Sequence, residues 1–273
     1  PGAALAPLLT DAVPMVRGRA AEALGLLNAT DSATAISGMA AEYAAGPALA
    51  GMAPDDERWP PAAELEAFKL GILALVRLGA YDALAAAVLD PNGRPVTTWW
   101  PVAYALQRIG DPRAAPALRQ LVAVRGRYTP AFAIRGLAAA KDAQAGEVIL
   151  PLLDPQKMPR EVVVAAIRAS AQLGLTAAAE RVATIASELR IEPNIRLECV
   201  DALAQLKAVD HVPLVQDLMT DDWPAMRAAA LRAAAAIDAE SFALILSGLD
   251  RDPRWIVRAG AGDGLGRVAA AVA

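Results

Sequence analysis

Side chains that commonly carry out chemistry are scarce in this sequence, which has a single histidine, His211, and a single cysteine, Cys199. A histidine-based metal cluster is therefore excluded, because such a site draws several ligands together. A Cys–His nucleophile lacks support, because no histidine lies near Cys199 in the sequence. We interpret Cys199 as a buried structural thiol and His211 as a surface or helix-capping residue.

Two other patterns resemble catalytic motifs but have a simpler structural interpretation. The glycines of Gly260–Gly266 look like a phosphate-binding loop, but their spacing fits neither nucleotide fingerprint and no lysine follows. The acidic groups Asp55-Asp56-Glu57 and Asp221-Asp222 lie in predicted turns, where solvated or helix-capping carboxylates are typical. We therefore predict a protein that is not an enzyme and that has no catalytic, cofactor-binding or metal-binding residues.

The composition also restricts the function. The net charge is −4 over 273 residues, whereas nucleic-acid-binding proteins usually carry a basic excess. No nucleic-acid partner is therefore expected, and DNA binding through the arginine-rich middle is kept only as a minor alternative. No apolar stretch reaches about 18 uncharged residues, so no transmembrane segment is predicted. We expect a soluble protein, and a single cysteine is compatible with the cytoplasm or the periplasm.

The elements that must position any site are repeated helices. Three segments, Asp11–Gly25, Asp221–Ala236 and Asp252–Gly266, share one motif. In each, an aspartate lies six residues before an arginine, an apolar residue directly precedes that arginine, and small residues follow at helical spacing. Arg196 fits the same motif without the aspartate, since position 190 is arginine. The arginines at 196, 227 and 258 are spaced by 31 residues, which indicates an internal repeat.

The repeat extends backwards along the chain through a shared ending, small-Leu-x-x-apolar-Gly, with steps of 31 or 33 residues. One step is 51 residues and so contains an insertion, which we place at Gly46–Pro61 because its prolines and glycines disfavour a helix. The predicted repeats span about 1–29, 31–79 (with the inserted loop 46–61), 80–110, 111–141, 142–174, 175–207, 208–238 and 239–270.

Each unit is predicted to be a helix, a tight turn and a second helix. The last unit illustrates this, with helices at Ser241–Leu249 and Trp255–Val268 separated by a break at Asp250–Pro253. Asp accepts hydrogen bonds from free amides at a helix start, and Pro is tolerated in the first turn. The helical spacing predicts a buried stripe in the second helix, made of Ile256, Val257, Ala261 and Leu265. Stacked units share a continuous core. The predicted fold is therefore all-α, a right-handed α-solenoid of about eight helix-turn-helix repeats forming one domain over 1–273.

At these motifs the chain resembles the HEAT-repeat family, in particular its short bacterial type with 31-residue units. The family pattern Asp-x-x-Pro-x-Val-Arg-x-x-Ala-Ala-x-Ala-Leu-Gly is matched best by Asp11–Gly25, and the middle units match only by spacing. In that family the aspartate and arginine commonly form a ladder of hydrogen bonds between adjacent units. The resemblance implies this structural role for Asp11, Arg17, Arg196, Asp221, Arg227, Asp252 and Arg258. The partner of Arg196 stays open, because its own unit lacks the aspartate.

The resemblance implies a non-catalytic scaffold for protein–protein interaction, binding a partner protein through its concave face and inserted loop. The alternative is a HEAT module of a larger enzyme, such as a fusion to a cyclophilin-type peptidyl-prolyl isomerase or a bilin-lyase-like subunit. No isomerase sequence is present. The start at Pro1 and the apolar residues 268–273 lead us to expect a piece of a longer protein, with room for a fused domain beyond it.

Second helices usually line the concave face of a HEAT solenoid. The residue five positions after each motif arginine points away from the core stripe, and this row is Glu22, Leu73, Tyr104, Arg135, Arg168, Asp201, Arg232 and Asp263. The row is either a solvated face with weak ion pairs or a groove for an acidic or mixed-charge segment. Aromatic side chains are favoured interface anchors. At least one of Trp99 and Trp100 is nevertheless expected in the core. Trp59, in the inserted loop, is expected either to contact a partner or to hold the loop against the solenoid. The candidates for partner binding are Trp59, Trp99, Trp100, Tyr104, Phe132, Arg135, Arg168, Asp201 and Arg232.

Overall fold

The computed structural model describes residues 2–58 and 61–272, and these fold into consecutive helix pairs. The first helix of each pair is called the A helix and the second the B helix. Within the described ranges there is no strand, only an isolated antiparallel bridge between Leu89 and Pro95. The prediction of an all-α solenoid is confirmed.

The chain divides into two compact units, unit 1 at residues 1–148 and unit 2 at residues 149–273. The boundary falls inside one short A helix, α9 (Ala145–Ile149). Both units are built from the same kind of helix pair. A single domain over 1–273 stays a prediction.

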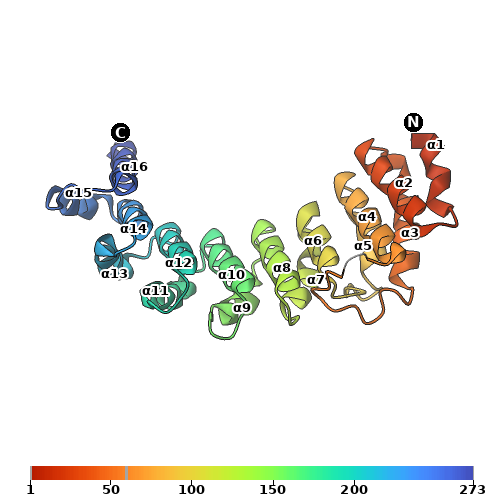
Figure 1. The fold of residues 1–273 in the computed structure, drawn as a ribbon, viewed down its shortest axis with the longest axis horizontal. Helices are drawn as coiled ribbons and strands as arrows, with labels where there is room; N and C mark the ends of the chain where they lie inside the picture. The colour runs from red at the N-terminus through yellow and green to blue at the C-terminus, as the bar shows by residue number, and fades with distance from the viewer. Residues whose placement is uncertain (1, 59–60, 273) are drawn as a thin grey trace. The chain divides into compact units, whose positions relative to one another are not determined.

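In unit 1, B helices pack on B helices and form one layer, with the A helices in a second layer (Figure 1). The B layer contains α2 (Pro14–Leu26), α4 (Ala63–Arg77), α6 (Trp100–Ile109) and α8 (Tyr128–Ala139). The A layer contains α1 (Gly2–Leu5) with the 3-10 turn η1 (Ala6–Thr10), η2 (Thr30–Ser32), α3 (Ala33–Ala44), α5 (Tyr81–Val88), η3 (Pro112–Ala114) and α7 (Ala115–Val122). The inserted segment runs between α3 and α4 without forming a helix in its described part, as its prolines and glycines predict.

Unit 2 has the same two layers. Its B helices are α10 (Arg160–Gln172), α12 (Pro193–Gln205), α14 (Pro224–Ile237) and α16 (Trp255–Val272). Its A layer contains the end of α9, η4 (Leu150–Leu152), η5 (Thr176–Ala178), α11 (Ala179–Ser187), η6 (Val209–His211), α13 (Val212–Asp217), η7 (Leu218–Thr220) and α15 (Ala239–Ser247).

The shared ending of the repeats terminates the B helices. Gly79, Gly110 and Gly174 have positive φ directly after their helices, and Asn28, Lys141 and Lys207 adopt the same conformation at the equivalent positions. A left-handed residue after the last turn lets the chain reverse while its amides satisfy the final helical carbonyls. Glycine does this without steric cost, which explains why the ending recurs.

One repeat position marks the core of every B helix except the last. We number positions from the motif arginine or its equivalent, and position +7 is at most 3% exposed in the first seven repeats. Its occupants there are Leu24, Leu75, Leu106, Leu137, Ser170, Leu203 and Ala234. Burial of a large apolar side chain at this position contributes about 1.5–3 kcal/mol per repeat to the free energy of folding.

The last B helix departs from its predicted core. Val257 is buried, but Leu265 at position +7 is 48% exposed, Ile256 is 37% exposed and Ala261 is only half-buried. The prediction that Ile256 and Leu265 belong to the core is therefore wrong. The physical reason is that no further helix pair covers α16 among the described residues, whereas each earlier B helix has another helix pair after it.

Candidate functional site

An aromatic cluster joins α4, α6 and α8 in unit 1. Trp99 is 5% exposed and stacks on the buried Phe68, with ring centroids 6.4 Å apart. The half-buried Trp100 lies 6.1 Å from Phe132, and Tyr104 meets Phe132 edge-on at 5.1 Å. Trp99 is thus the core tryptophan of the pair, and Trp100 reaches the surface.

A cation completes this surface. The guanidinium of Arg135, one turn after Phe132 on α8, lies 5.5 Å from the Phe132 ring centroid. Such a cation over an aromatic face gains about 0.5–1 kcal/mol at an exposed site. No carboxylate of the described residues forms an ion pair with Arg135, so its charge is available to a partner. We call Trp100, Tyr104, Phe132 and Arg135 the aromatic patch.

The inserted segment positions the aromatic patch. The Pro54 carbonyl accepts from the Trp100 amide at 2.7 Å, and both indole N–H groups, of Trp99 and Trp100, donate to the Asp56 carbonyl at 3.0 and 3.3 Å. These bonds fix the start of α6. The described part of the insertion, through residue 58, therefore has a structural role, while Trp59 lies outside the described residues.

The same segment also caps α8. The Asp55 carboxylate accepts from the backbone amides of Arg127, Tyr128 and Thr129, and the Thr129 hydroxyl donates to the Pro54 carbonyl at 3.2 Å. The first amides of a helix lack internal partners, and a capping carboxylate typically stabilises them by about 1 kcal/mol. Asp55 supplies this cap from 72 residues earlier in the chain.

Unit 2 is connected by arginine–aspartate pairs. Arg196 is 5% exposed and donates to the Ala186 carbonyl at 2.8 Å and to the Asp221 carboxylate at 3.1 Å. Arg227 pairs in the same way with Asp252, at 2.8 and 3.2 Å. Each arginine thus reaches the aspartate of the following repeat, 25 residues later, so Arg196 needs no aspartate in its own repeat.

Unit 1 departs from this arrangement. Arg17 donates to the Leu9 carbonyl at 2.8 Å and forms a two-nitrogen ion pair with Glu42 at the end of α3, again 25 residues later. This bond holds the carboxyl pKa of Glu42 below its ordinary value. The insertion begins just after Glu42 and displaces the next B helix. A glutamate on the A helix therefore takes the position of the ladder aspartate.

The charged row of unit 2 is largely engaged within the chain. Arg168 makes a bidentate contact with Glu198 on the next B helix, with an Nε–Oε2 distance of 2.7 Å. Asp201 and Arg232 line a polar pocket of about 400 Å³ together with Lys207 and Arg267. Burial between the helices raises the carboxyl pKa of Asp201, and the charge of Arg232 opposes this shift; the side chain still reaches solvent inside the pocket. These contacts are consistent with a solvated B-helix face on which ion pairs join neighbouring repeats.

The residues that resemble catalytic groups have structural positions. Cys199 is fully buried on α12, and this burial raises its thiol pKa to about 12, so the reactive thiolate is disfavoured. His211 is half-buried with its Nε2 atom 3.7 Å from Glu180. Gly260 and Gly264 lie inside α16, where a Cβ would come within 2.8 Å of the Ala228 carbonyl and 2.7 Å of Phe242. They allow close helix packing and form no phosphate loop.

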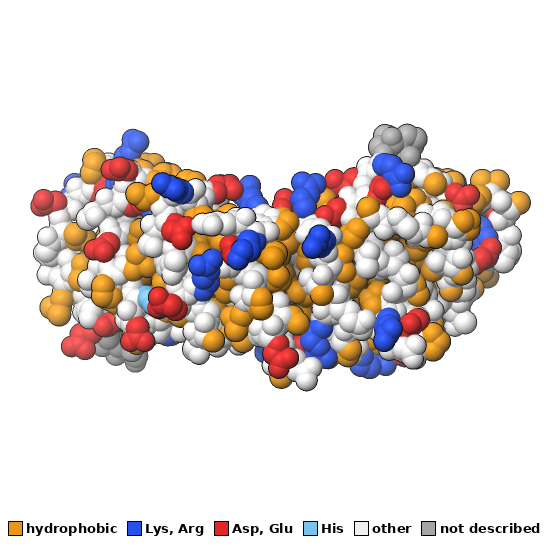
Figure 2. All heavy atoms as spheres, turned by 90° about the horizontal axis from the view of Figure 1, so that it is seen from below, with side chains coloured by type: hydrophobic (Ala, Val, Ile, Leu, Met, Phe, Trp, Pro, Cys, Tyr) orange, Lys and Arg blue, Asp and Glu red, His pale blue; other side chains and the backbone are white. Residues whose placement is uncertain are grey.

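Other kinds of site have no candidate in the part of the chain that the structure describes. Among these residues no three His, Cys, Asp or Glu side chains gather as metal ligands. Over the same ranges no helix has the length and apolar character needed to cross a bilayer. On the face shown in Figure 2, basic and acidic side chains are interspersed.

Comparison with known proteins supports the fold. The family model for HEAT repeats matches residues 182–266. An engineered protein of known crystal structure is 19% identical, with a TM-score of 0.54 over 98% of this chain and 78% of that chain. The complex of CpcE and CpcF of phycocyanin lyase from Nostoc sp. is 18% identical, with a TM-score of 0.47 over 99% and 94% of the two chains. A second engineered protein is 20% identical, with a TM-score of 0.46 over 87% and 96%. No curated protein matches the chain.

The paired helices, their two layers and the similarity to the first engineered protein define the class, a helical repeat protein of the solenoid type. The match over residues 182–266 then identifies HEAT repeats in that part of the chain. This confirms the expected resemblance to HEAT repeats. HEAT repeats form a scaffold fold that is typically non-catalytic and commonly mediates protein interaction.

Proposed function

We propose that this protein is a non-catalytic scaffold that binds a partner protein through the B-helix face of unit 1, with the aromatic patch as the main contact. The observation that carries the proposal is the patch itself. Trp100, Tyr104 and Phe132 are in mutual ring contact, and Arg135 is stacked on Phe132 with no ion pair to a described carboxylate.

The residue types of the patch support a protein partner. Trp, Tyr and Arg are enriched among the few interface residues that dominate binding energy. The rings are held in place by the bonds from Pro54 and Asp56 to α6, so little side-chain entropy is lost when a partner packs on them. Arg135 adds a positive charge, which favours a partner segment with acidic as well as apolar side chains.

The charged row of unit 2 supports the same function less strongly. Arg168 is already neutralised by Glu198, and a partner would have to replace that contact. Asp201 and Arg232 flank a pocket open to solvent and offer charges of both signs. We therefore place the principal contact in unit 1 and an auxiliary, mixed-charge contact in unit 2.

The test is a quantitative pull-down from the source organism with the wild-type chain and two patch variants, Tyr104→Ala and Arg135→Glu. Each patch variant is expected to reduce recovery of a specific partner at least tenfold, corresponding to about 1.4 kcal/mol or more. Arg168→Glu is expected to have a smaller effect, because Arg168 is paired with Glu198.

A matched control separates the patch from general charge effects. Arg125 is exposed in the turn between α7 and α8, and Arg125→Glu makes the same change of charge in the same unit. The control is expected to retain the partner, and circular dichroism is expected to show unchanged helix content for all variants. Equal recovery with Arg135→Glu, Tyr104→Ala and Arg125→Glu would refute the assignment of the patch.

A further inference from the structure

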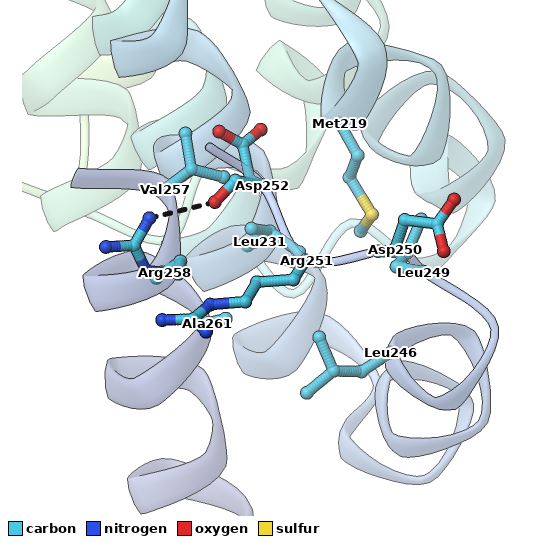
Figure 3. Close-up of a pocket in the computed structure, with 10 residues that line it drawn as sticks. All are labelled: Met219, Leu231, Leu246, Leu249, Asp250, Arg251, Asp252, Val257, Arg258 and Ala261. Atoms are coloured by element: carbon cyan, nitrogen blue, oxygen red, sulfur yellow. Dashed lines mark hydrogen bonds between the residues drawn. The ribbon is translucent and has the colours of Figure 1, made fainter. Parts of the chain in front are cut away.

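The motif arginines of the B helices are bonded within the chain. Arg227 donates through Nε to the Asp252 carboxylate at 2.8 Å. Arg258 donates through Nη1 to the Asp252 carbonyl at 2.9 Å, as Figure 3 shows. In unit 1, Arg17 donates to the Glu42 carboxylate at 3.1 Å. These guanidinium groups connect segments of the array, and their contacts explain why the motif contains arginine.

Three arginines on the B helices of unit 1 have no such contact. Arg77 and Arg108 lie at position +9, in the last turns of α4 and α6, and Arg135 lies at position +5 of α8. All three are exposed, and no oxygen atom of the described residues accepts a hydrogen bond from their side chains. The negative end of a helix favours arginine in a last turn, but this interaction leaves the guanidinium donors free. We call these three residues the basic group.

The charge of the basic group is not balanced by nearby carboxylates. The helices α6 and α8 contain no Asp or Glu. The carboxylates that follow the three B helices in the sequence pair with arginines of the A layer, Asp82 and Asp111 with Arg113, and Asp142 with Arg119. The A layer therefore uses these negative charges, and the B-helix face of unit 1 keeps its positive charge.

The acidic group of the inserted segment, residues 55–57, lies at the opposite ends of these helices. It caps the start of α8 and forms ion pairs with Arg58 and Arg127. Arg77 and Arg108 lie in the last turns of their helices. Positive charge thus gathers toward the ends of α4 and α6, away from the carboxylates of the insertion.

Apolar side chains lie beside the basic group. Residues four apart on a helix are neighbours on one face, so Leu73 lies one turn before Arg77, and Tyr104 lies one turn before Arg108. Leu73 and Tyr104 are half-buried. An apolar row and a basic row therefore run side by side across α4 and α6, and the aromatic patch with Arg135 continues them onto α8.

We propose that this face binds an acidic segment of the partner protein in the polyproline II conformation. The segment crosses α4, α6 and α8, with carboxylates on successive turns facing the basic group and apolar side chains against the aromatic patch. Charge complementarity selects an acidic partner, and aromatic-lined surfaces recognise polyproline II segments. This inference rests on the proposed function and names the chemistry of the partner.

The spacing of the helices favours this conformation. Packed helices lie about 8–10 Å apart, and side chains three residues apart in polyproline II project from the same side about 9 Å apart. Side chains on one face of a β-strand recur about every 7 Å, which does not match. A helical segment with carboxylates seven residues apart matches the spacing, but its carbonyls are bonded internally. Polyproline II leaves its carbonyls free to accept from the arginines.

A single-stranded nucleic acid also has regularly spaced negative charge, but the patch suits it less well. Such strands stack their bases on aromatic side chains. Here Trp100, Tyr104 and Phe132 contact one another, and Arg135 lies over the Phe132 ring. The net charge of the chain, −4, also disfavours a nucleic acid.

The test is fluorescence anisotropy of the 273-residue chain with labelled synthetic probes. The main probe is a peptide of repeated Glu-Pro-Pro triplets. Its controls are a peptide of the same composition with all glutamates grouped at one end, a peptide of Lys-Pro-Pro triplets, an acidic α-helical peptide and an oligouridylate. The triplet peptide is expected to bind at least tenfold more tightly than each control, and its affinity is expected to fall with salt.

Variants of the chain locate the contact. Arg77→Glu and Arg108→Glu are each expected to weaken binding of the triplet peptide at least tenfold, because each places like charges across the contact. Arg94→Glu and Arg125→Glu, the same charge change at exposed turn positions of unit 1, are expected to leave it unchanged. Circular dichroism checks that all four variants are folded.

The outcomes separate this inference from the proposed function. It is overturned if the triplet peptide does not bind, if any control probe binds as tightly, or if Arg77→Glu and Arg108→Glu bind the peptide like the wild type. The same two variants are also used in the pull-down. Loss of the partner with Tyr104→Ala but not with Arg77→Glu or Arg108→Glu contradicts the inference alone. Retention of the partner by all variants contradicts the proposed function as well.

Discussion

Units 1 and 2 are built from the same helix pairs but are connected differently. In unit 2 a side chain of the repeat motif links each repeat to the next, as in the pairs Arg196–Asp221 and Arg227–Asp252. In unit 1 the insertion reaches past its neighbour and binds the starts of both α6 and α8. The comparison shows that one long inserted segment, by contacting several repeats, can take the place of a regular arginine–aspartate ladder.

The largest expected effect tests the aromatic core of unit 1. Trp99→Ala is expected to lower the free energy of unfolding of unit 1 by about 4 kcal/mol, because it removes a buried ring and its bond to Asp56. Amide hydrogen exchange resolved by residue checks this, since protection is expected to fall in residues 2–148. Trp100→Ala is the matched control and is expected to cost less, because that ring is half-exposed.

The next effect tests the ladder of unit 2. Arg196→Ala is expected to destabilise that unit by about 3 kcal/mol, because it leaves the Asp221 carboxylate and the Ala186 carbonyl without a buried partner. Urea unfolding followed by hydrogen exchange over 149–272 measures it. Arg190→Ala, at an exposed position, is expected to change little, and an equal effect of the two variants would contradict the ladder.

A smaller effect tests the cap supplied by the insertion. Asp55→Ala is expected to cost about 1–2 kcal/mol and to accelerate exchange of the Tyr128 and Thr129 amides, which lose their acceptor. Glu57→Ala, in the same segment but only in a 3.7 Å surface pair with Arg127, serves as the control. Unchanged exchange at α8 in the Asp55 variant would show that the cap does not stabilise this helix.

The end of unit 2 gives a still smaller effect. Leu265→Ala is expected to cost less than about 1 kcal/mol in the isolated chain, since the side chain is nearly half exposed. Leu203→Ala, at the same position in a covered unit, is expected to cost about 2–5 kcal/mol. Thermal unfolding of the two variants side by side checks the difference, and equal costs would show that Leu265 is buried in solution.

The smallest effect is a pH dependence specific to the ladder. The bond from Arg227 holds the carboxyl pKa of Asp252 below its ordinary value of 3.8. The stabilisation is therefore complete above that value and is lost as the pH falls through the lower pKa of the folded state. The stability difference between wild type and Arg227→Met is expected to shrink from pH 5 to pH 2, and a difference that is constant over this range would contradict the assignment.

The sequence predicts the repeat, its helix pairs and its core, because small and apolar residues recur with the period of the repeat. It does not directly reveal the partner of Arg196. In the other motifs an aspartate lies six residues before the arginine, which suggests a pairing within one repeat. The actual partner is the aspartate 25 residues after the arginine, in the next repeat. The two spacings add up to the 31-residue period, so the ladder can be derived by following each arginine forward to Asp221 and Asp252.

The cap on α8 is harder to predict. Arg127, at the start of that helix, makes no side-chain capping bond, and the sequence suggests only that the acidic group at residues 55–57 is solvated or caps some helix. The acceptor, Asp55, lies far away in a segment without periodicity, and nothing in the spacing connects the two. The positions of Trp99 and Trp100 involve the same segment, because both indole N–H groups donate to the Asp56 carbonyl.

The reach of Asp55 has a consequence for how the gene can change. Where each unit touches only its neighbours, whole 31-residue blocks can be duplicated or deleted and the array rejoins in register. That freedom holds for the ladder of unit 2. It does not hold between α4 and α8, because removing the pair α5 and α6 would leave the bonds from Pro54 and Asp56 without Trp99 and Trp100 and shift Asp55 away from its helix. The insertion thus constrains the number of repeats between α4 and α8, whereas the ladder of unit 2 imposes no such constraint.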